Sequence, residues 1–302
     1  MIGLINKLRN LFQRGNIFIR LIYINIAVFF VTALITTFFQ LFNKTTVSVF
    51  SFLELPASFF RFAGRPWSLI SYMFMHADFL HLLFNMLWLY GFGMLFLSFF
   101  SAKHLRGLYI LGGIFGGLLY MLCYNVFPYF RLQVEHSSMV GASASVLAVV
   151  IAVAYREPDY SIRLLFLGNI RLKYIALVVV LSDLLFITSG NAGGHIAHLG
   201  GAFTGFGFVV GLNKGVDITS WMNKFLDVVL VLFNRTTWQH KRKPFMKMQQ
   251  LHSEKTKKHK LAGNKKTYSH VMMDDILDKL KKSGYESLTT EEKKTLFDAS
   301  RK

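Results

Sequence analysis

Six long runs of apolar residues occupy the first two thirds of the chain, and they restrict its fold more than any other feature. A helix needs about 20 apolar residues to cross a bilayer, and continuous runs favour helices over a membrane barrel, whose strands alternate. Only 17% of the 302 residues are charged, against about 25% in soluble domains. The sequence therefore predicts an all-α polytopic membrane protein, a six-transmembrane-helix bundle with a short cytosolic helical tail. The runs are centred on Ile17–Phe42, Phe79–Phe100, Leu108–Phe127, Ala142–Ala154, Tyr174–Thr188 and Ile196–Gly211.

Basic residues in the connections indicate the orientation of the chain. Lys103, His104 and Arg106 join the second and third runs, further Arg and Lys residues join the fourth and fifth, and a Lys-rich tail follows the sixth. By the positive-inside rule, these connections and both termini lie in the cytoplasm. The first run is too long for a cleaved secretory signal, so we expect it to remain as a span. We expect a multi-pass protein of the bacterial plasma membrane, with a cytosolic segment at 1–16, a six-helix domain at 17–213 and an external, aromatic loop at about 43–76 that lies at the membrane interface.

Polar side chains occur at the same expected depth in three of the runs. Such residues are costly in lipid and usually functional. Even-numbered helices run from outside to inside, so their first residues lie near the outer face. The fourth run is short, which predicts a helix that begins below the membrane surface, where its backbone must face protein or a water-filled cavity. The residues concerned are His76, His81 and Asn85 on the second helix, Ser143 on the fourth, and His195 and His198 on the sixth.

A serine and a histidine at one depth indicate a nucleophile and a general base. Ser143 would lie in the first turn of a helix, where free backbone N–H groups favour negative charge. A tetrahedral oxyanion could be stabilised there, with Asn85 and His81 as side-chain donors. The serine and histidine helices must approach closely, and small residues allow this in lipid. They are Ala144, Ala148 and Ala152 on the fourth helix, and Gly201 and Gly205 on the sixth.

At these positions the sequence resembles the rhomboid intramembrane serine proteases. The family's H-x-x-x-N appears as His81 and Asn85, its G-x-S as Gly141 to Ser143, and its A-H-x-x-G-x-x-x-G runs from Ala197 through His198 and Gly201 to Gly205. The resemblance covers about residues 17–213, with the motifs in the family's order. It implies an endopeptidase with a Ser143–His198 dyad and an oxyanion hole made by His81, Asn85 and the Ser143 N–H. It also implies that transmembrane protein substrates are cut near the outer membrane face.

Three positions depart from the family pattern. Ala144 replaces a glycine, which adds a methyl group at the expected contact between the fourth and sixth helices. Leu147 replaces a frequent tyrosine, and Ser68 replaces the arginine of a Trp-Arg pair. None of the three removes a catalytic group, so we expect them to alter substrate preference and rate.

The remaining polar residues have simpler interpretations. His195 and His198 could bind a metal, but no carboxylate or Cys is obviously placed beside them, so neither a metal nor a cofactor is expected. His76 is expected at the membrane interface. Asp183 could orient a histidine as a third catalytic member, although a helix-packing hydrogen bond, for example to His195, is favoured. Cys123 is expected to be an apolar filler.

Two other functions stay open at this point. A haem protein could use His81, His195 or His198 as axial ligands. A catalytically inactive rhomboid-like scaffold could bind membrane clients through the same fold, and Ala144 and Leu147 keep this alternative open.

The part of the chain after the sixth run is basic. Residues 214–234 have the pattern of an amphipathic helix along the inner membrane surface. The tail, 235–302, is expected to contain two short helices, at Val271–Lys282 and after an N-cap at Thr289 or Thr290. Between residues 235 and 266 there are 11 basic residues and one acid, Glu254. Anionic lipid is the expected partner of this stretch, and nucleic acid is not expected because aromatic stacking platforms are sparse.

Overall fold

The computed structural model describes residues 15–42, 47–164, 168–233 and 275–300. The chain divides into two compact units, 1–228 and 229–302. The expectations for residues 1–14 and for most of the basic stretch, at 235–274, lie outside the described residues.

The first unit is a helical bundle whose elements match the predicted runs. By length and composition, four helices could cross a membrane: α2 (Ile17–Leu41), α6 (Phe79–Phe99), α7 (Ala102–Val126) and α10 (Ala192–Asn213). The other two predicted spans are the shorter helices α8 (Ser143–Arg156) and α9 (Leu172–Leu185).

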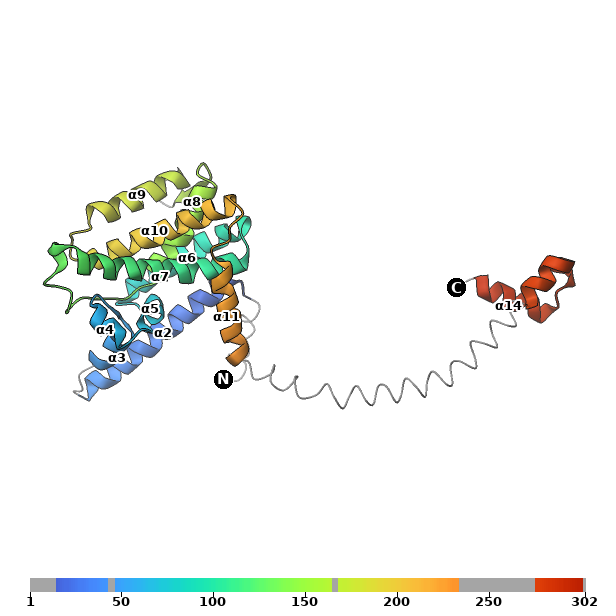
Figure 1. Ribbon diagram of the computed structural model, residues 1–302, viewed down its shortest axis with the longest axis horizontal. Helices are drawn as coiled ribbons and strands as arrows, with labels where there is room; N and C mark the ends of the chain where they lie inside the picture. The colour runs from blue at the N-terminus through green and yellow to red at the C-terminus, as the bar shows by residue number, and fades with distance from the viewer. Residues whose placement is uncertain (1–14, 43–46, 165–167, 234–274, 301–302) are drawn as a thin grey trace. The chain divides into compact units, whose positions relative to one another are not determined.

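Helix α10 has its most extensive contacts with α7 and α8, and α8 also packs on α6. In Figure 1, α9 and α2 lie on opposite sides of α7 and α10, and their contacts agree: α9 packs on α10 and α8, and α2 packs on α6 and α7. The centre of the bundle is therefore shared by α7, α8 and α10. Every residue of α8 from Ala144 to Ala154 is buried.

The predicted loop at 43–76 is folded into short elements. Most of it consists of short helices, and its two-residue strand β1 (Leu55–Pro56) pairs antiparallel with β2 (Ser138–Met139), just before α8. A second pair, β3 (Ser161–Leu164) and β4 (Gly168–Arg171), forms a hairpin between α8 and α9 that the sequence did not predict. The helical elements are α3 (Val47–Leu53), α4 (Phe59–Ala63), α5 (Ser68–Ser71) and the 3-10 turn η1 (Tyr72–Phe74), and a further 3-10 turn, η2 (Pro128–Phe130), follows α7.

Helix α7 begins before the predicted third run, which corrects one expectation. Lys103, His104 and Arg106 are helical residues, not a connection, because the Ser101 hydroxyl caps the helix by accepting a hydrogen bond from the His104 N–H, at 3.2 Å. Arg106 then pairs with Asp227 at 2.7 Å. The ion pair joins α7 to α11 (Ser220–Phe233), the helix predicted at 214–234.

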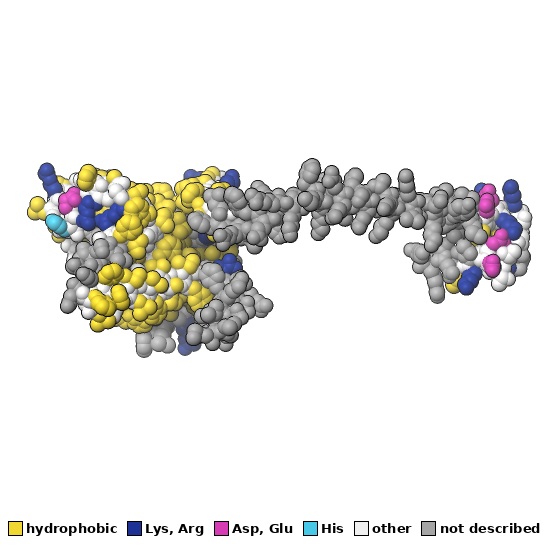
Figure 2. All heavy atoms as spheres, turned by 90° about the horizontal axis from the view of Figure 1, so that it is seen from below, with side chains coloured by type: hydrophobic (Ala, Val, Ile, Leu, Met, Phe, Trp, Pro, Cys, Tyr) yellow, Lys and Arg dark blue, Asp and Glu magenta, His cyan; other side chains and the backbone are white. Residues whose placement is uncertain are grey.

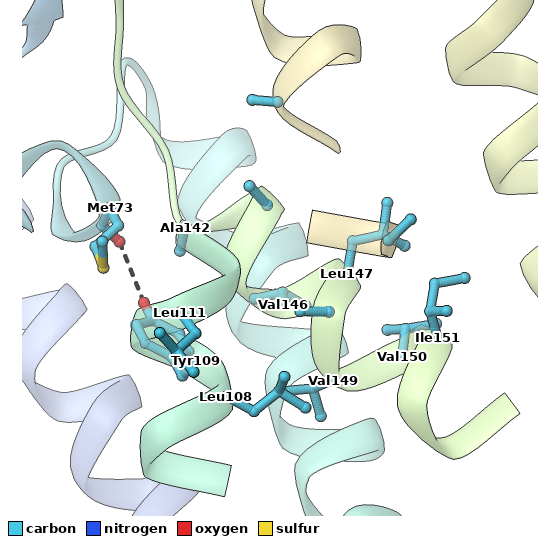
Figure 3. Close-up of a cluster of buried hydrophobic side chains, with 14 of the residues drawn as sticks. Met73, Leu108, Tyr109, Leu111, Ala142, Val146, Leu147, Val149, Val150 and Ile151 are labelled. Carbon is cyan, nitrogen blue, oxygen red and sulfur yellow. Dashed lines mark hydrogen bonds between the residues drawn. The ribbon is translucent and has the colours of Figure 1, made fainter. Parts of the chain in front are cut away.

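A buried cluster joins the folded loop to α7 and α8 (Figure 3). The Tyr109 hydroxyl donates to the Met73 carbonyl at 3.1 Å and accepts from the Asn25 amide of α2, also at 3.1 Å. Because a polar group buried in apolar surroundings needs a partner, these two bonds fix η1 and α2 against α7. The α8 side chains drawn in the same cluster include Val146, Leu147, Val149, Val150 and Ile151.

The surface of the first unit is apolar, as expected for a protein in lipid. Figure 2 shows hydrophobic side chains over most of its visible face, with Lys and Arg toward the edges. Large apolar side chains are exposed on α2, α6 and α9, including Leu34 (68%), Leu87 (60%) and Leu185 (76%). An exposed apolar surface of this extent would cause aggregation in water, so the described part of the chain is that of a membrane protein.

Residues 275–300, the described part of the tail, form two short helices where the sequence predicts them. One covers 275–283, and the other is α14 (Thr290–Ser300), which follows the 3-10 turn η3 (Tyr285–Ser287). Thr289 is the N-cap of α14: its hydroxyl accepts from the Glu292 N–H at 3.3 Å, and Glu292 accepts from the Thr289 N–H at 2.7 Å. This reciprocal capping box confirms the predicted helix start, and it holds the pKa of Glu292 below its usual value.

The helix pair α8–α10 is in backbone contact. A side chain on Gly201 would collide with the Ala144 carbonyl oxygen, and one on Gly205 with the Ala148 carbonyl oxygen. The methyl group of Ala144 lies close to a third helix. It faces α7, where a Cβ on Gly116 would lie 2.7 Å from it.

We expect Gly205→Ala to destabilise the protein by about 1–3 kcal/mol, because the added methyl would overpack the α8–α10 contact. Gly207→Ala is the matched control: it lies on the same helix, and a Cβ there meets nothing within 4 Å. Denaturant titration of both variants in detergent micelles measures the difference. Equal stability of the two variants would show that the helices do not pack this closely.

Candidate active site

Helix α6 places His81 in its first turn and Asn85 one turn later. The helix begins where it does because the Asp78 carboxylate accepts a hydrogen bond from the His81 N–H, at 2.8 Å. Asn85 is buried, and its amide donates to the His81 carbonyl at 2.8 Å. That bond uses one of the two amide N–H donors and leaves the second available.

A tight turn leads into Ser143. Gly141 has a φ of 140°, a value that side-chain-bearing residues rarely adopt. A Cβ there would also lie 2.9 Å from His81 Cε1 and 3.0 Å from His81 Nε2. The Gly141 N–H donates to the Tyr72 carbonyl at 3.0 Å, which ties the turn to η1. The glycine thus allows the α6 imidazole to pack directly on the backbone before Ser143.

Ser143 is the first residue of α8, and this helix end is not capped. The N-cap position is Ala142, which has no side-chain acceptor. In the described residues, no hydrogen bond is formed by the Ser143 N–H. A capping side chain stabilises a helix by about 1 kcal/mol, so its absence leaves donors and the positive end of the helix dipole free beside the Ser143 hydroxyl.

His198 lies on α10, in the second turn, and shares two cavities with Ser143. The larger, of about 620 Å³, is lined by both residues together with His81 and Gly141, and polar residues such as Ser137 contribute to its wall. The smaller, of about 220 Å³, is lined by both residues together with Asn85. The rest of its wall is apolar: Phe84, Trp88, Val146, Leu147 and Val179.

Ser143 and His198 therefore lie at the boundary between a polar and an apolar cavity. The structure brings together the four residues selected from the sequence, with His81 on the polar side and Asn85 on the apolar side. Among the described residues no hydrogen bond joins the Ser143 hydroxyl to His198, and catalytic hydrogen bonds are often long before substrate binds.

A carboxylate contacts both histidines of α10. Asp183 Oδ1 lies 2.8 Å from His195 Nδ1 and 2.9 Å from His198 Nδ1. The predicted Asp183–His195 bond is confirmed, and the contact with His198 is additional. The expectation that no carboxylate lies beside the two histidines is wrong. The signal for the contact was the position of Asp183 in the outer half of the fifth run, at the depth of the histidines.

The same three residues are the group within the described ranges that could hold a metal ion. One ligand atom from each of Asp183, His195 and His198 lies within 4.8 Å of the others. Two imidazole nitrogens and a carboxylate oxygen form a ligand set that suits Zn²⁺. The two short Nδ1–Oδ1 distances are, however, those of hydrogen bonds.

His76 lies inside the protein, not at its surface. Its side chain is 1% exposed, and its ring packs edge-on against His81 with the centroids 5.2 Å apart. Burial lowers the pKa of His76 to about 4, and the neighbouring His81 adds to the effect. The imidazole is therefore neutral near pH 7 and supports the His81 ring sterically.

The structure also shows where Leu147 and Ser68, the other two departures from the family pattern, lie. Leu147 lines the apolar cavity, where it shapes the wall beside Ser143. Ser68 begins α5 and is fully buried, so it cannot take the position of an exposed basic residue. Cys123 is partly buried and packs at the edge of the core.

Comparison with known proteins finds matches to two parts of the chain. A family of unknown function (DUF6576) matches residues 262–302. RHOMBOID-like protein 12, mitochondrial, from Arabidopsis thaliana, is 28% identical over 149 residues, which are 46% of this chain and 44% of that protein. The chain thus spans less than half the length of this relative. The model of the rhomboid domain matches residues 63–214, half of the chain and all four candidate residues, and the chain belongs to the rhomboid family.

Proposed function

We propose that this protein is an intramembrane serine endopeptidase that cuts transmembrane protein substrates near the outer membrane face. Ser143 is the nucleophile and His198 the general base. His81, Asn85 and the Ser143 N–H form the oxyanion hole.

The observation that carries the proposal is the position of Ser143 and His198 on the walls of the same two cavities. They come from different helices, α8 and α10, which are in backbone contact at Gly201 and Gly205. A nucleophile and a base on rigid, closely packed elements can keep a fixed separation. The uncapped first turn of α8 supplies donors at the same place.

The reaction follows from these positions. His198 Nε2 removes the proton of the Ser143 hydroxyl while the oxygen attacks the scissile carbonyl. The negative charge on the former carbonyl oxygen is stabilised by the donors of the oxyanion hole. His198 then gives the proton to the leaving amine, and the C–N bond breaks to leave an acyl-enzyme. A water molecule from the polar cavity, deprotonated by His198, hydrolyses the ester and restores Ser143.

The two cavities fit the two reactants. Water needs a polar route to Ser143, and the larger cavity supplies polar lining groups. A transmembrane substrate brings an apolar segment, and the smaller cavity is lined mainly by apolar side chains of α6, α8 and α9. Helices α6 and α9 make at most slight contact with each other, so a substrate segment could approach Ser143 between them.

The membrane arrangement is part of the proposal. The six proposed spans rest on the apolar runs, and the cytoplasmic position of both termini rests on the charge distribution. The proposed location is the bacterial plasma membrane. Helix α11 would lie along the inner surface, since Trp221, Phe225 and Val228 are exposed. The basic stretch between residues 235 and 266 would bind anionic lipid.

An inactive, client-binding rhomboid is the second candidate. It is favoured by the absence, in the described residues, of a hydrogen bond between Ser143 and His198, and the Arabidopsis relative is itself named rhomboid-like. A haem protein is the weaker alternative, and a Soret band in the purified protein would indicate it.

We expect a fluorophosphonate probe to label the purified protein at Ser143, because only an activated serine reacts at an appreciable rate. Ser143→Ala abolishes labelling, and His198→Ala lowers its rate by about a thousandfold or more. Gel fluorescence and mass spectrometry of the labelled peptide measure both.

Ser145→Ala is the matched control for this experiment. Ser145 lies two residues further along α8, is fully buried, and its hydroxyl contacts the Met73 sulfur at 3.9 Å. The Ser145→Ala variant should be labelled at the same rate as the wild type. A folded wild type that is not labelled would favour the inactive scaffold, and labelling that survives Ser143→Ala would identify a different nucleophile.

We expect Asn85→Leu to lower the rate of substrate cleavage by about a hundredfold, because the side chain supplies one donor to the oxyanion. The similar size of Leu preserves the packing of α6. Cleavage of a transmembrane model substrate in liposomes measures the rate constants, with the exposed Asn169→Ala as control. A fall in affinity alone, with an unchanged maximal rate, would place Asn85 in substrate binding instead.

A further inference from the structure

One carboxylate oxygen lies between two histidines of the same helix. Asp183, on α9, is 4% exposed, and its Oδ1 lies 2.8 Å from His195 Nδ1 and 2.9 Å from His198 Nδ1. Residues three apart share a helix face, so both rings reach the same oxygen. A carboxylate oxygen accepts hydrogen bonds, so each ring can make this contact as a donor through Nδ1–H.

These bonds determine which nitrogen of His198 is basic. A neutral imidazole carries one proton, and the partner of one ring nitrogen decides where it resides. With the proton on Nδ1 and directed at Asp183, the lone pair is on Nε2. That is the nitrogen required for removing the proton of Ser143, which lines the same cavities.

The free-energy cost of burying the Asp183 carboxylate also indicates that this residue has a functional role. A carboxylate inside an apolar helix bundle is expensive, and an unpaired buried acceptor adds to the cost. Asp183 Oδ2 has no partner among the described residues. Plain helix packing would be served as well by an apolar side chain, whereas two histidine donors on one oxygen are what an ionised carboxylate needs.

We propose that Asp183 is a positioning residue that holds His198 in its Nδ1–H tautomer and orients its ring toward Ser143, with His195 as a second hydrogen-bond donor to the same carboxylate. This inference rests on the proposed protease function. It extends the Ser143–His198 pair to a third member supplied by a separate helix, α9.

Asp183 does not receive a proton in this scheme. When His198 Nε2 takes the proton of Ser143, the ring becomes a cation with both nitrogens protonated. The carboxylate, at hydrogen-bond distance from Nδ1, stabilises that cation until Nε2 passes the proton to the leaving amine.

The test compares the maximal rate and the affinity of fluorophosphonate labelling in three variants. Asp183→Asn is expected to lower the maximal rate by about a hundredfold or more, with the probe affinity unchanged. The maximal labelling rate of His195→Gln, which retains an N–H donor, should be close to that of the wild type. The rate of His195→Leu should lie between those of the wild type and Asp183→Asn. Asp159→Asn is the matched control, because this carboxylate is exposed on the loop before α9 and pairs with Lys173.

A second measurement determines the tautomer in the wild-type protein itself. Nitrogen NMR of histidine-labelled wild type reports the tautomer of each ring, with the His198 signals assigned by their loss in His198→Ala. The Nδ1–H form supports the proposal, and the Nε2–H form overturns it.

The remaining outcomes are also decisive. A labelled wild type with an unchanged Asp183→Asn rate overturns the positioning role and leaves the protease function standing. A folded wild type that is not labelled overturns both. If a chelator raises the labelling rate of the wild type, a metal joins the three residues in place of the protons, and the positioning role is wrong.

Discussion

The close contact between α8 and α10 is the interaction on which the candidate site depends. Lipid offers no hydrophobic driving force between helices, so association relies on close van der Waals packing. Gly201 and Gly205 let α10 lie directly against the carbonyls of Ala144 and Ala148. The serine is the first residue of α8, and His198 precedes Gly201 on α10 by less than a turn. A larger spacing between the helices would separate the two residues before any other part of the bundle changed.

The same contact allows α8 to begin without a cap. A helix end with free N–H groups is unfavourable by itself, and α8 has only 14 residues. The helix is held instead by burial on several sides, since α7 also approaches it through Gly112 and Gly116. Packing thus supplies the stability that the first turn lacks, and its N–H groups stay available. Gly141 likewise has a backbone conformation that serves the site, because it brings the backbone against His81.

The helices were predictable because a bilayer demands long apolar segments, and all six runs are helical. Their ends were less predictable: Ser101 extends α7 over charged residues that hydropathy assigns to a connection. The β3–β4 hairpin was missed, because strands of only 4 residues carry little periodic signal. At the site, topology alone placed Ser143, His81, Asn85 and His198 at one depth. It could not show that Asp183 reaches His198, since the rotation of α9 about its axis depends on tertiary packing.

The rotation of α9 about its axis determines both how this helix docks on the bundle and whether Asp183 reaches the histidines of α10. Leu172 and Asp183 are the buried residues of this helix, while Leu181, Leu184 and Leu185 near Asp183 are exposed. The outer half of α9 is attached to the bundle through this carboxylate and the two histidines of α10, and through the partly buried Val179 and Val180. In apolar surroundings charge-assisted hydrogen bonds are strong. The docking of α9 and the orientation of His198 are consequently linked: a displacement of the outer half of α9 away from α10 also removes the carboxylate that lies 2.9 Å from His198 Nδ1.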